Sequence, residues 1–356
     1  QAPRTLEAIQ NRDCGWFFEA AQDEFTKIPG GPLAYWLNAR VMEAFNNERL
    51  LGDLLPIRGG MTTADNERFV RLWWEVDLFK FARPSIESSS KWFPYNKGGE
   101  YRKWFGNRTW VVNWADDGRE IKSTGRASVR SEELYTSTMI GWTDVTSFAQ
   151  LGVRDYGEGF LFDASGPALF PTPTVPHNHV LGFLASKLAS VILQALNPTL
   201  HIQAGNVASL PWLSPTGRAA TTLDDAVKGL VAETKSDWDA YERSWDFQSL
   251  PLLTASSEPT PTLESSYTAW ITQNKDTIAE MKRLEEENNR LFIDAYGLAD
   301  ELTPDVPIEQ ITLTVNPAYR YGKKVTIDAQ WTRFRQDTME ELVSYAIGCM
   351  MGRYSL

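Results

Sequence analysis

The chain has 356 residues, and its 42% hydrophobic content is enough to bury at least one sizeable core, so the length favours two or three domains. No run of about eighteen apolar residues free of charge occurs, from which we expect no membrane-spanning segment. Two distant cysteines without a CxxC pair favour a reduced, cytoplasmic setting. The net charge of −11 would argue against a nucleic-acid partner if the charge were spread evenly along the chain. The local distribution of charge therefore has to be considered.

Residues 1–58 carry apolar and aromatic side chains at helical spacing, interrupted by Pro29-Gly30-Gly31-Pro32. This pattern predicts two helices joined by a turn. The chain starts at Gln1 without an initiator Met or a charged-then-apolar leader. We therefore expect residues 1–58 to be a helical connector from a missing part of a longer protein.

From Gly59 the sequence changes to short, aromatic-rich runs of β-prone residues, separated by clusters of Gly, Asn, Asp and Ser. An amphipathic helix follows, and then a strand-like segment. The predicted strands are at 69–76, 110–114, 159–162 and 200–203, and the predicted helix is at 180–196. Residues 59–215 are thus predicted to form a mixed α/β unit in a chain of α+β class.

The next segment, residues 216–302, is predicted to be a helical hairpin that acts as a spacer. Two long helical patterns are divided by a Pro/Ser/Thr-rich break at 256–261, and the second has a near-heptad, coiled-coil-like seam. From 219 to 302 there are seventeen acidic and seven basic residues, a pattern typical of a solvated outer face or of a surface for a partner. Residues 303–356 are predicted to form a strand at 311–315, a turn and a helix.

Basic residues gather in one window, 91–130, which holds nine bases and four acids and so carries +5 of charge. Its first part, 91–107, interleaves aromatics, bases and glycines. Lys and Arg neutralise phosphates, glycine lets backbone N–H groups approach them, and Asn or Arg reads base edges, so this mixture suits DNA. The same residues also fit an aromatic-rich loop with its bases lying over the rings. Residues alone leave the two interpretations open.

A second candidate is the run 58–69, a Gly-Gly turn followed by hydroxyl, amide and basic side chains. It lacks both GxxxxGK[ST] and GxGxxG, which excludes a nucleotide-binding loop of either type. A contact to a DNA backbone and an ordinary capped turn remain, and the residues favour the turn.

No catalytic or metal site is predicted. The three histidines, His177, His179 and His201, lack a cysteine and enough nearby carboxylates to hold a metal, so we expect loop histidines. An SxxK match at 88–91 lacks the partner motifs of a Ser-Lys acyl enzyme. Asn316-Pro317-Ala318-Tyr319 is similar to the Asn-Pro-Pro-Tyr motif of amino-methyltransferases, but its third residue is Ala and no FxGxG-type loop for S-adenosylmethionine occurs. We interpret it as a strand-ending turn.

Long runs in the sequence resemble the C-terminal half of the PglX family, the adenine-specific methyltransferases of BREX phage-defence systems. They include GGMTTADNERFVRLWWEV from Gly59, KWFPYNKGGEYRKWFGNRTWVVNWADDGREIK from Lys91, VLGFLASKLASVILQALNPTLHIQAGNVASLP from Val180, YERSWDFQSLPLL from Tyr241 and ELTPDVPIEQITLTVNPAYRYG from Glu301. The resemblance implies that the catalytic motif and the S-adenosylmethionine loop lie upstream, in a methyltransferase domain to which residues 1–58 connect. We expect no cofactor bound to this chain.

Residues 59–215 also resemble the target-recognition domains of single-chain restriction-methylation enzymes, with a GxxTGxN-like opening run and a closing LGxLNSK…NPT…LP unit. Ala64 and Ala185 depart from the usual Gly and Asn. The resemblance implies that the unit holds double-stranded DNA while one adenine is flipped into the missing domain. The alternative is a protein-interaction scaffold for other BREX subunits or a DNA-mimicking phage inhibitor.

The expected DNA contacts combine basic, amide, hydroxyl and phenol side chains. They are Lys91, Tyr95, Asn96, Lys97, Arg102, Lys103, Asn107, Lys122 and Arg126, with Thr62, Thr63 and Asn66 as a second group. The window's tryptophans, Trp92, Trp104, Trp110 and Trp114, are expected to pack between strands instead.

Overall fold

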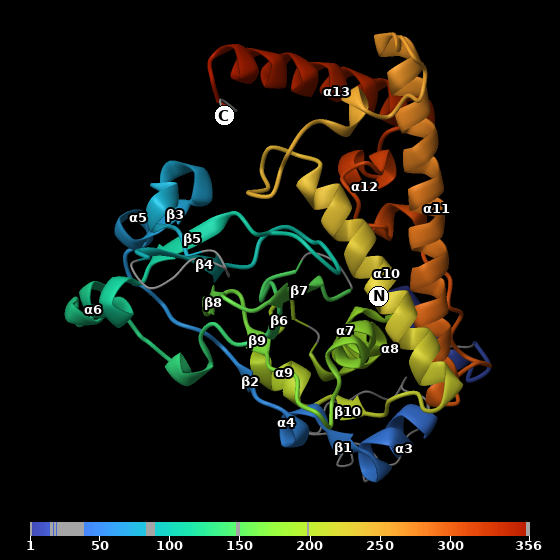
Figure 1. Cartoon of the computed structure of the whole chain (residues 1–356). Coiled ribbons are helices and arrows are strands. Elements are labelled where there is room, and N and C mark those ends of the chain that lie inside the picture. The colour runs from blue at the N-terminus through green and yellow to red at the C-terminus, as the bar shows by residue number, and fades with distance from the viewer. Residues whose placement is uncertain are drawn as a thin grey trace.

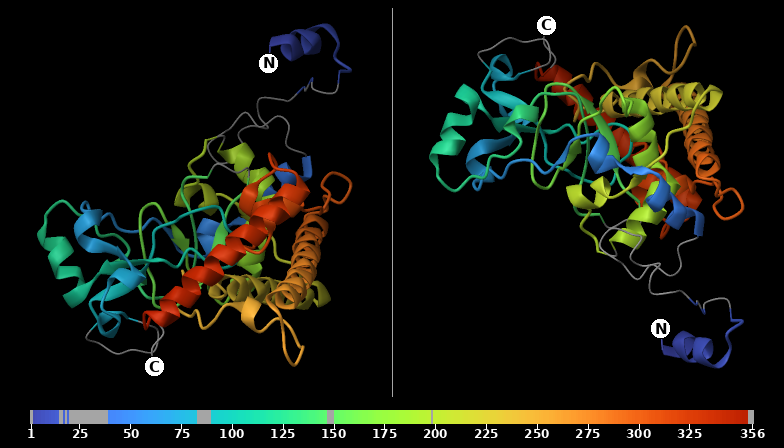
Figure 2. Two further views of the ribbon diagram at one scale, coloured as in Figure 1. Left: turned by 90° about the horizontal axis from the view of Figure 1, so that it is seen from above. Right: turned by 90° about the horizontal axis from the view of Figure 1, so that it is seen from below.

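The computed structural model describes residues 2–14, 17, 19, 39–82, 90–146, 150–197 and 199–353. The first described helices are α1 (Ala2–Gln10) and α3 (Ala39–Asn47). The predicted turn at 29–32 lies outside the described residues. Figure 2 shows α1 standing away from the body of the molecule, whereas α3 packs at its base.

The strands of the described residues form three small sheets. In the first, β1 (Arg49–Leu50) pairs with β10 (Pro211–Trp212). The second has the order β2 (Ile57–Arg58), β9 (Ala168–Leu169), β6 (Met139–Trp142) and β7 (Val153–Gly157). The third has the order β3 (Val70–Leu72), β5 (Trp110–Asn113), β4 (Trp92–Asn96) and β8 (Leu161–Phe162), with β4 and β8 parallel.

Short helices connect these strands. They are α4 (Leu51–Leu54), α5 (Asn66–Phe69), η1 (Trp73–Glu75), η2 (Leu78–Lys80), α6 (Ala115–Ser123), η3 (Glu132–Leu134) and α9 (Ala204–Ala208). Strand predictions are confirmed for nearly all of the run at 110–114, but only for the first part of 69–76, which continues as η1, and for the end of 159–162. The run at 200–203 contributes only an isolated bridge between His201 and Val145.

The helix predicted at 180–196 is two helices, α7 (His177–Ala185) and α8 (Lys187–Leu196), bent by 66°. The break is at Ser186, whose backbone is extended and whose hydroxyl accepts a hydrogen bond from Ala189 N, capping α8. Among the described residues no single helix is long and apolar enough to cross a membrane, and only this bent pair reaches such a composition.

The hairpin consists of α10 (Arg218–Asp239) and α11 (Leu263–Ala295), which run antiparallel along one side of the molecule, joined by a long loop that contains η4 (Pro251–Leu253) (Figure 1). Thr262 and Ser265 form a reciprocal cap at the start of α11, directly after the predicted Pro/Ser/Thr-rich break. The α+β class with a long helical hairpin is thus confirmed.

The last segment contains η5 (Ile308–Gln310), α12 (Pro317–Tyr321) and α13 (Ile327–Met350). The strand predicted at 311–315 is wrong, because this buried extended segment pairs with no other strand of the described residues. The backbone N–H groups of Thr314 and Val315 instead donate to the carboxylate of Asp237 at the end of α10. A side chain thereby satisfies donors that a sheet would otherwise pair.

Two hydrophobic cores organise the molecule. The buried residues of the smaller core run from Met61 to Phe170 and come from both four-stranded sheets, and Trp245 packs against them. The larger combines β6, β7 and α7 to α9 with α10, α11 and the segment after η5. Because the hairpin shares the larger core with the sheets, it is fixed against the mixed α/β unit and is not a free arm. Figure 2 shows that α6 and α5 lie at the end of the molecule opposite α11.

Candidate nucleic-acid interface

Three segments from distant parts of the sequence end side by side at the edge of the third sheet. Met61 N donates to Phe162 O at 3.0 Å, Ala164 N donates to Met61 O at 3.0 Å, and Asp163 N donates to Asn96 O at 2.9 Å. Residues 59–66, here called the GG loop, thus lie beside the ends of β4 and β8. The contact requires glycine at position 60, because a Cβ there would lie 1.9 Å from Phe162 O.

The GG loop turns sharply before α5. Ala64 has a φ of +59°, in the left-handed region that favours glycine. The glycine usual at this point of the resembling run therefore suits the backbone conformation and need not mark a DNA contact. Asp65 then caps α5 by accepting a hydrogen bond from Arg68 N at 3.1 Å.

Side chains from these segments meet in a polar cluster of Thr63, Asn66, Tyr95, Lys97 and Asp163. Lys97 Nζ lies 3.3 Å from Asn66 Oδ1 and 3.2 Å from Asp163 Oδ2. The Thr63 hydroxyl also donates to Asn66 Oδ1 at 2.9 Å, and the Tyr95 hydroxyl donates to Asp163 at 2.6 Å. The cluster thus joins the two segments that the sequence singled out, 58–69 and 91–107. It also holds the exposed Asn66 side chain in place.

Asp163 is the anion of the polar cluster. Burial would raise its pKa, but hydrogen bonds from Ser165 and Tyr95 and the charge of Lys97 outweigh burial and hold the pKa below its usual value. The Tyr95 pKa is raised well above its usual value by burial and by the neighbouring Asp163. The cluster is therefore a carboxylate–ammonium pair with a neutral phenol.

A second loop, residues 124–131 and here called the basic loop, lies against the GG loop. Thr62 N donates to Ser128 O at 2.8 Å and Ser128 N donates to Thr62 O at 2.9 Å. Arg126 and Arg130 stand two residues either side of Ser128, and both are exposed. Within the described residues neither forms an ion pair with an acid. Thr62 thus lies beside a loop that carries two exposed guanidinium groups.

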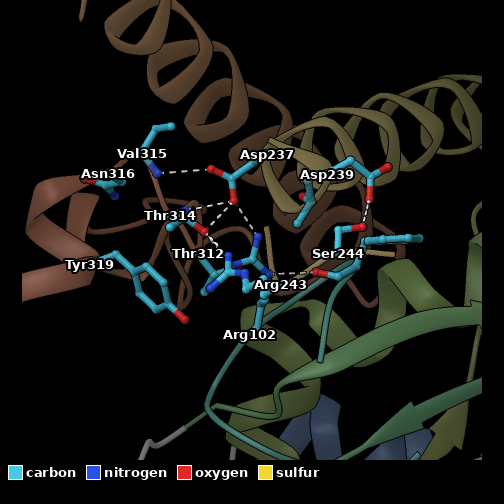
Figure 3. A network of polar contacts seen from close by, with 12 residues as sticks. Arg102, Asp237, Asp239, Arg243, Ser244, Thr312, Thr314, Val315, Asn316 and Tyr319 are labelled. Atoms are coloured by element: carbon cyan, nitrogen blue, oxygen red, sulfur yellow. Dashed lines mark hydrogen bonds and ion pairs between the residues drawn. The ribbon is translucent and has the colours of Figure 1, made fainter. Parts of the chain in front are cut away.

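The structure corrects the expectation for Arg102 and Lys103, whose side chains are only 3% and 2% exposed. Arg102 pairs with Asp237 of α10, and its other guanidinium nitrogens donate to Phe105 O and to Thr314 (Figure 3). Lys103 pairs with Glu285 of α11. Both bases hold the 91–107 segment against the hairpin, so neither is proposed as a DNA contact.

Four more of the expected contacts have structural roles. Asn96 is fully buried; its side chain donates to Gly166 O at 2.9 Å and accepts from Gly98 N at 3.1 Å. Asn107 donates to Glu100 O at 2.8 Å. Tyr95 and Thr63 are buried below the surface, where they orient Asp163 and Asn66. Asn96, Tyr95 and Thr63 are too buried to touch DNA in this conformation.

Other bases lie over aromatic rings, as the alternative interpretation predicted. The Lys91 and Lys122 ammonium groups are 5.4 and 5.1 Å from the ring centres of Trp92 and Trp114. Lys122 also pairs with Glu132, and the half-buried Arg108 lies over the Phe105 ring. The sequence count of +5 therefore overstates the charge that this window offers to solvent. Among the four tryptophans, Trp104 and Trp114 are buried and pack as expected.

The histidines and the Asn-Pro-Ala-Tyr motif make ordinary structural contacts, although His177 Nδ1 has no hydrogen-bond partner among the described residues. His177 and His179 lie in the first turn of α7, not in a loop, and bind Asp155 and Ser214. No group of three His, Cys, Asp or Glu among the described residues could hold a metal. Asn316 caps α12, accepting from Ala318 N and donating to Ile308 O and Ile311 O. Its amide is used in backbone contacts, so the motif forms a turn, but one that ends no strand.

Sequence reasoning missed Asp163 and left Arg130 out of the contact set. Asp163 follows directly on β8, and an acid at the end of a buried β-prone run was a usable signal. Arg130 stood in the basic window, but its proximity to Thr62 depends on the pairing at Ser128, which leaves no local pattern.

The chain is similar to two curated proteins. It is 34% identical to the adenine-specific methyltransferase PglX of Lacticaseibacillus casei (strain Zhang), a match that covers 99% of the chain and 29% of that protein. It is 33% identical to the adenine-specific methyltransferase BrxX of Escherichia coli O9:H4 (strain HS), over 96% of the chain and 27% of that protein. The chain thus spans less than a third of the length of these relatives.

Protein-family models and solved structures provide two further comparisons. No protein-family model matches the chain. A solved structure of the type IIL restriction-modification enzyme MmeI in complex with DNA matches with a TM-score of 0.44 and 13% sequence identity, over 74% of the chain and 35% of that protein.

Proposed function

From its homology to one region of the PglX and BrxX adenine-specific methyltransferases, we propose that this chain recognises duplex DNA on behalf of such an enzyme. Residues 59–215 would be the target-recognition domain, residues 1–58 the connector and residues 216–302 the spacer. The relatives' names support methyl transfer to adenine as the activity of the longer protein, and BREX phage defence is its proposed setting.

The observation that carries this proposal is the pairing of the basic loop with the GG loop, which also supplies Thr63 and Asn66 to the polar cluster. Arg126 and Arg130 are exposed and, within the described part of the chain, free of acid partners, which suits contacts to phosphates. The paired GG loop carries exposed groups that are held in place: Thr62 by the pairing with Ser128, and Asn66 by Thr63 and Lys97. Fixed polar groups near side chains that bind phosphates suit base readout.

The cluster also restricts what Asn66 reads. Its Oδ1 already accepts from Thr63 and Lys97, which leaves the Nδ2 group for a ligand. A bidentate contact to adenine uses both atoms of the amide, whereas a single donor suits an acceptor such as guanine O6, guanine N7 or thymine O4. We therefore assign Asn66 to a guanine or thymine of the recognised site.

Methyl transfer is assigned to the rest of the longer protein. The motif that resembles the amine-holding motif of amino-methyltransferases serves here as the cap of α12, and Asn316 has no free amide group for a target base. These residues do not fit an S-adenosylmethionine-dependent centre, so no step of methyl transfer is derived from them. This region would present the duplex while the target adenine is flipped elsewhere.

The test is fluorescence anisotropy with labelled duplex DNA over a series of salt concentrations. The logarithm of the association constant should fall linearly with the logarithm of the salt concentration, and Arg126→Ala and Arg130→Ala should each reduce the slope by about 0.9. Arg283→Ala is the control, because Arg283 is also exposed but lies on α11. The duplex is chosen by mapping methylated sites in cells that carry the full-length protein.

Affinity that does not depend on salt would overturn the proposal. Retention of full DNA affinity by the Arg126→Ala/Arg130→Ala variant, with loss of binding to another defence subunit or to a DNA-mimicking inhibitor, would favour the scaffold alternative. Asn66→Ala separates recognition of the base sequence from binding of the phosphate backbone. It should lower affinity for the mapped site about tenfold while leaving affinity for non-specific DNA unchanged.

A further inference from the structure

Arg68 is an exposed arginine of α5 whose guanidinium group is held in one orientation. It forms an ion pair with Glu120 of α6, and its guanidinium carbon lies 4.9 Å from the ring centre of the buried Phe69. Glu120 is held in turn, because its other carboxylate oxygen accepts from the side chain of Asn113 at 3.1 Å. Asn113 is buried at the end of β5. The third sheet therefore fixes the direction of Arg68 through Glu120.

Most of the hydrogen-bonding capacity of Arg68 is unused. Its side chain is 53% exposed, and its Nη2 donates to Glu120. Its Nε and Nη1 donate to no group among the residues that the structure describes. Because exposed ion pairs contribute little to stability, this arrangement does little for the fold. A guanidinium group that is fixed and still presents free donors is organised in advance for a ligand.

Arg68 also stands where the elements proposed to bind DNA are joined. It follows Asn66 closely in the sequence, and Glu120 lies shortly before the basic loop. The ion pair is therefore a second link between the segments that carry the GG loop and the basic loop, besides the pairing of Thr62 with Ser128. Figure 2 shows α5 and α6 at the same end of the molecule.

The balance of charge distinguishes Arg68 from the arginines of the basic loop. Arg126 and Arg130 form no ion pair with an acid in the described part of the chain, which suits phosphates. The hydrogen bond from Arg68 lowers the pKa of Glu120, so Glu120 is ionised at neutral pH and would repel a phosphate. The edge of a base carries no net charge, and reading it requires donors in a fixed direction.

We propose that Arg68 reads a guanine of the recognised site, with Glu120 as its positioning residue, an inference that rests on the proposed DNA recognition. In the major groove guanine presents two neighbouring acceptors, O6 and N7, which match two parallel N–H groups of a guanidinium. Adenine places a donor beside its N7, thymine offers one acceptor, and cytosine offers a donor. Guanine is therefore the base that accepts both hydrogen bonds.

The experiment is fluorescence anisotropy of the complete chain with the mapped duplex and with duplexes in which one guanine at a time is replaced by 7-deazaguanine. This replacement removes the N7 acceptor and leaves Watson–Crick pairing intact. At one guanine of the site, it should weaken binding by the unsubstituted protein about tenfold.

Two variants that keep the net charge assign this guanine to Arg68. They are Arg68→Lys, which cannot form two parallel hydrogen bonds, and Arg68→Ala/Glu120→Gln. In both, the tenfold effect of 7-deazaguanine should disappear while affinity for non-specific DNA stays unchanged. Asp116→Asn/Arg119→Ala is the matched control, because it removes another exposed ion pair of α6 and should keep the effect. Circular dichroism checks that each variant is folded.

Glu120→Gln tests the positioning role. Without the carboxylate, Arg68 is less well oriented and its charge is no longer offset. The effect of 7-deazaguanine should therefore shrink, whereas affinity for non-specific DNA should rise about threefold. A residue that merely supports the fold would lower both affinities together.

The outcomes separate this proposal from DNA recognition itself. Salt-dependent binding in which no guanine shows an effect that depends on Arg68 would exclude the guanine contact and leave DNA recognition standing. Equal weakening of all duplexes by Arg68→Ala/Glu120→Gln would also exclude it, because a contact to the backbone is indifferent to sequence. Absence of any salt-dependent binding would remove both proposals.

Discussion

Asp163 holds more of the candidate interface together than any basic residue around it. Its carboxylate accepts hydrogen bonds from Tyr95, Lys97 and Ser165, and its backbone N–H binds Asn96 O. Through Lys97 it also governs the orientation of Asn66. An acid therefore positions the groups proposed to meet DNA, although DNA itself is an anion.

Asp163 should make the stability of the protein depend on pH. Because its folded-state pKa lies below the ordinary 3.8, it contributes stability that is present above 3.8 and is lost as the pH falls through the folded-state pKa. Asp163→Asn should cost about 1–2 kcal/mol of unfolding free energy at pH 7 and flatten the acid limb of the profile. Urea unfolding over a pH series measures both effects.

The control for this prediction is Asp116→Asn, because the Asp116 carboxylate is 64% exposed and pairs with Arg119 at the surface. An acid limb equally steep in Asp163→Asn and in the unsubstituted protein would contradict the role given to Asp163.

At the residue scale, sequence identified the right region and only part of the right set. Thr62, Asn66, Lys97 and Arg126 lie at the candidate interface, whereas Arg102 and Lys103 are buried. Their acid partners are 135 and 182 residues away in the sequence. Local composition shows where basic residues gather, but distant partners decide which of them are buried. A count of bases in a window therefore could not separate buried basic residues from those exposed to a ligand.

At the scale of elements, the GG loop depends on a close approach between two backbones. Gly60 lies against the carbonyl of Phe162, where the third sheet meets the loop. At the neighbouring Gly59, an added Cβ would meet no atom within 4 Å. The two adjacent glycines are therefore unequal, which provides a matched pair of substitutions.

Gly60→Ala should destabilise the protein by about 2 kcal/mol or more and displace the GG loop, because the new methyl group would overlap Phe162. Gly59→Ala should change the stability by less than about 0.5 kcal/mol. Chemical denaturation gives the stabilities and anisotropy gives the DNA affinity. Equal effects of the two substitutions would refute the packing argument.

Element predictions succeeded where one pattern was long and failed where a single side chain decided the backbone. The long periodic pattern of α11 gave its position well, since its start follows the break at 256–261. The helix at 180–196 is broken by Ser186, whose hydroxyl caps α8. The segment 311–315 has strand-like residues, but Asp237 binds its N–H groups. Periodicity carries no signal of either event.

At the scale of the whole molecule, two buried ion pairs join the mixed α/β unit to the hairpin. Arg102 reaches α10 and Lys103 reaches α11, and the Trp104 indole also donates to Glu285 at 2.9 Å. The larger core continues across the same boundary. We therefore expect the hairpin to set the position of the loops that we propose to contact DNA.

A double-mutant cycle tests this coupling. Lys103→Met and Glu285→Gln should each cost about 3 kcal/mol or more, because each leaves a buried charge unpaired. The double variant should cost clearly less than the sum, since both charges are gone and an acceptor for Trp104 remains. Urea unfolding supplies the four free energies.

The surface pair Arg283 and Glu280 is the control cycle, with a coupling expected within about 0.5 kcal/mol. Additive effects at Lys103 and Glu285 would show that the hairpin and the mixed α/β unit are not joined through this pair.

The contrast between the exposed side chains of the GG loop and the basic loop and the anchored end of the 91–107 segment has a consequence for how such proteins diversify. Thr62, Asn66, Arg126 and Arg130 can be exchanged without disturbing the core, because their side chains are exposed. Arg102 and Lys103 are tied to Asp237 and Glu285. Among homologues that recognise different DNA sites, the first four positions should vary freely. The two partners of each buried ion pair should be kept together or change together. Covarying positions would then identify the structural pairs, and variable positions would identify the residues that read the DNA sequence.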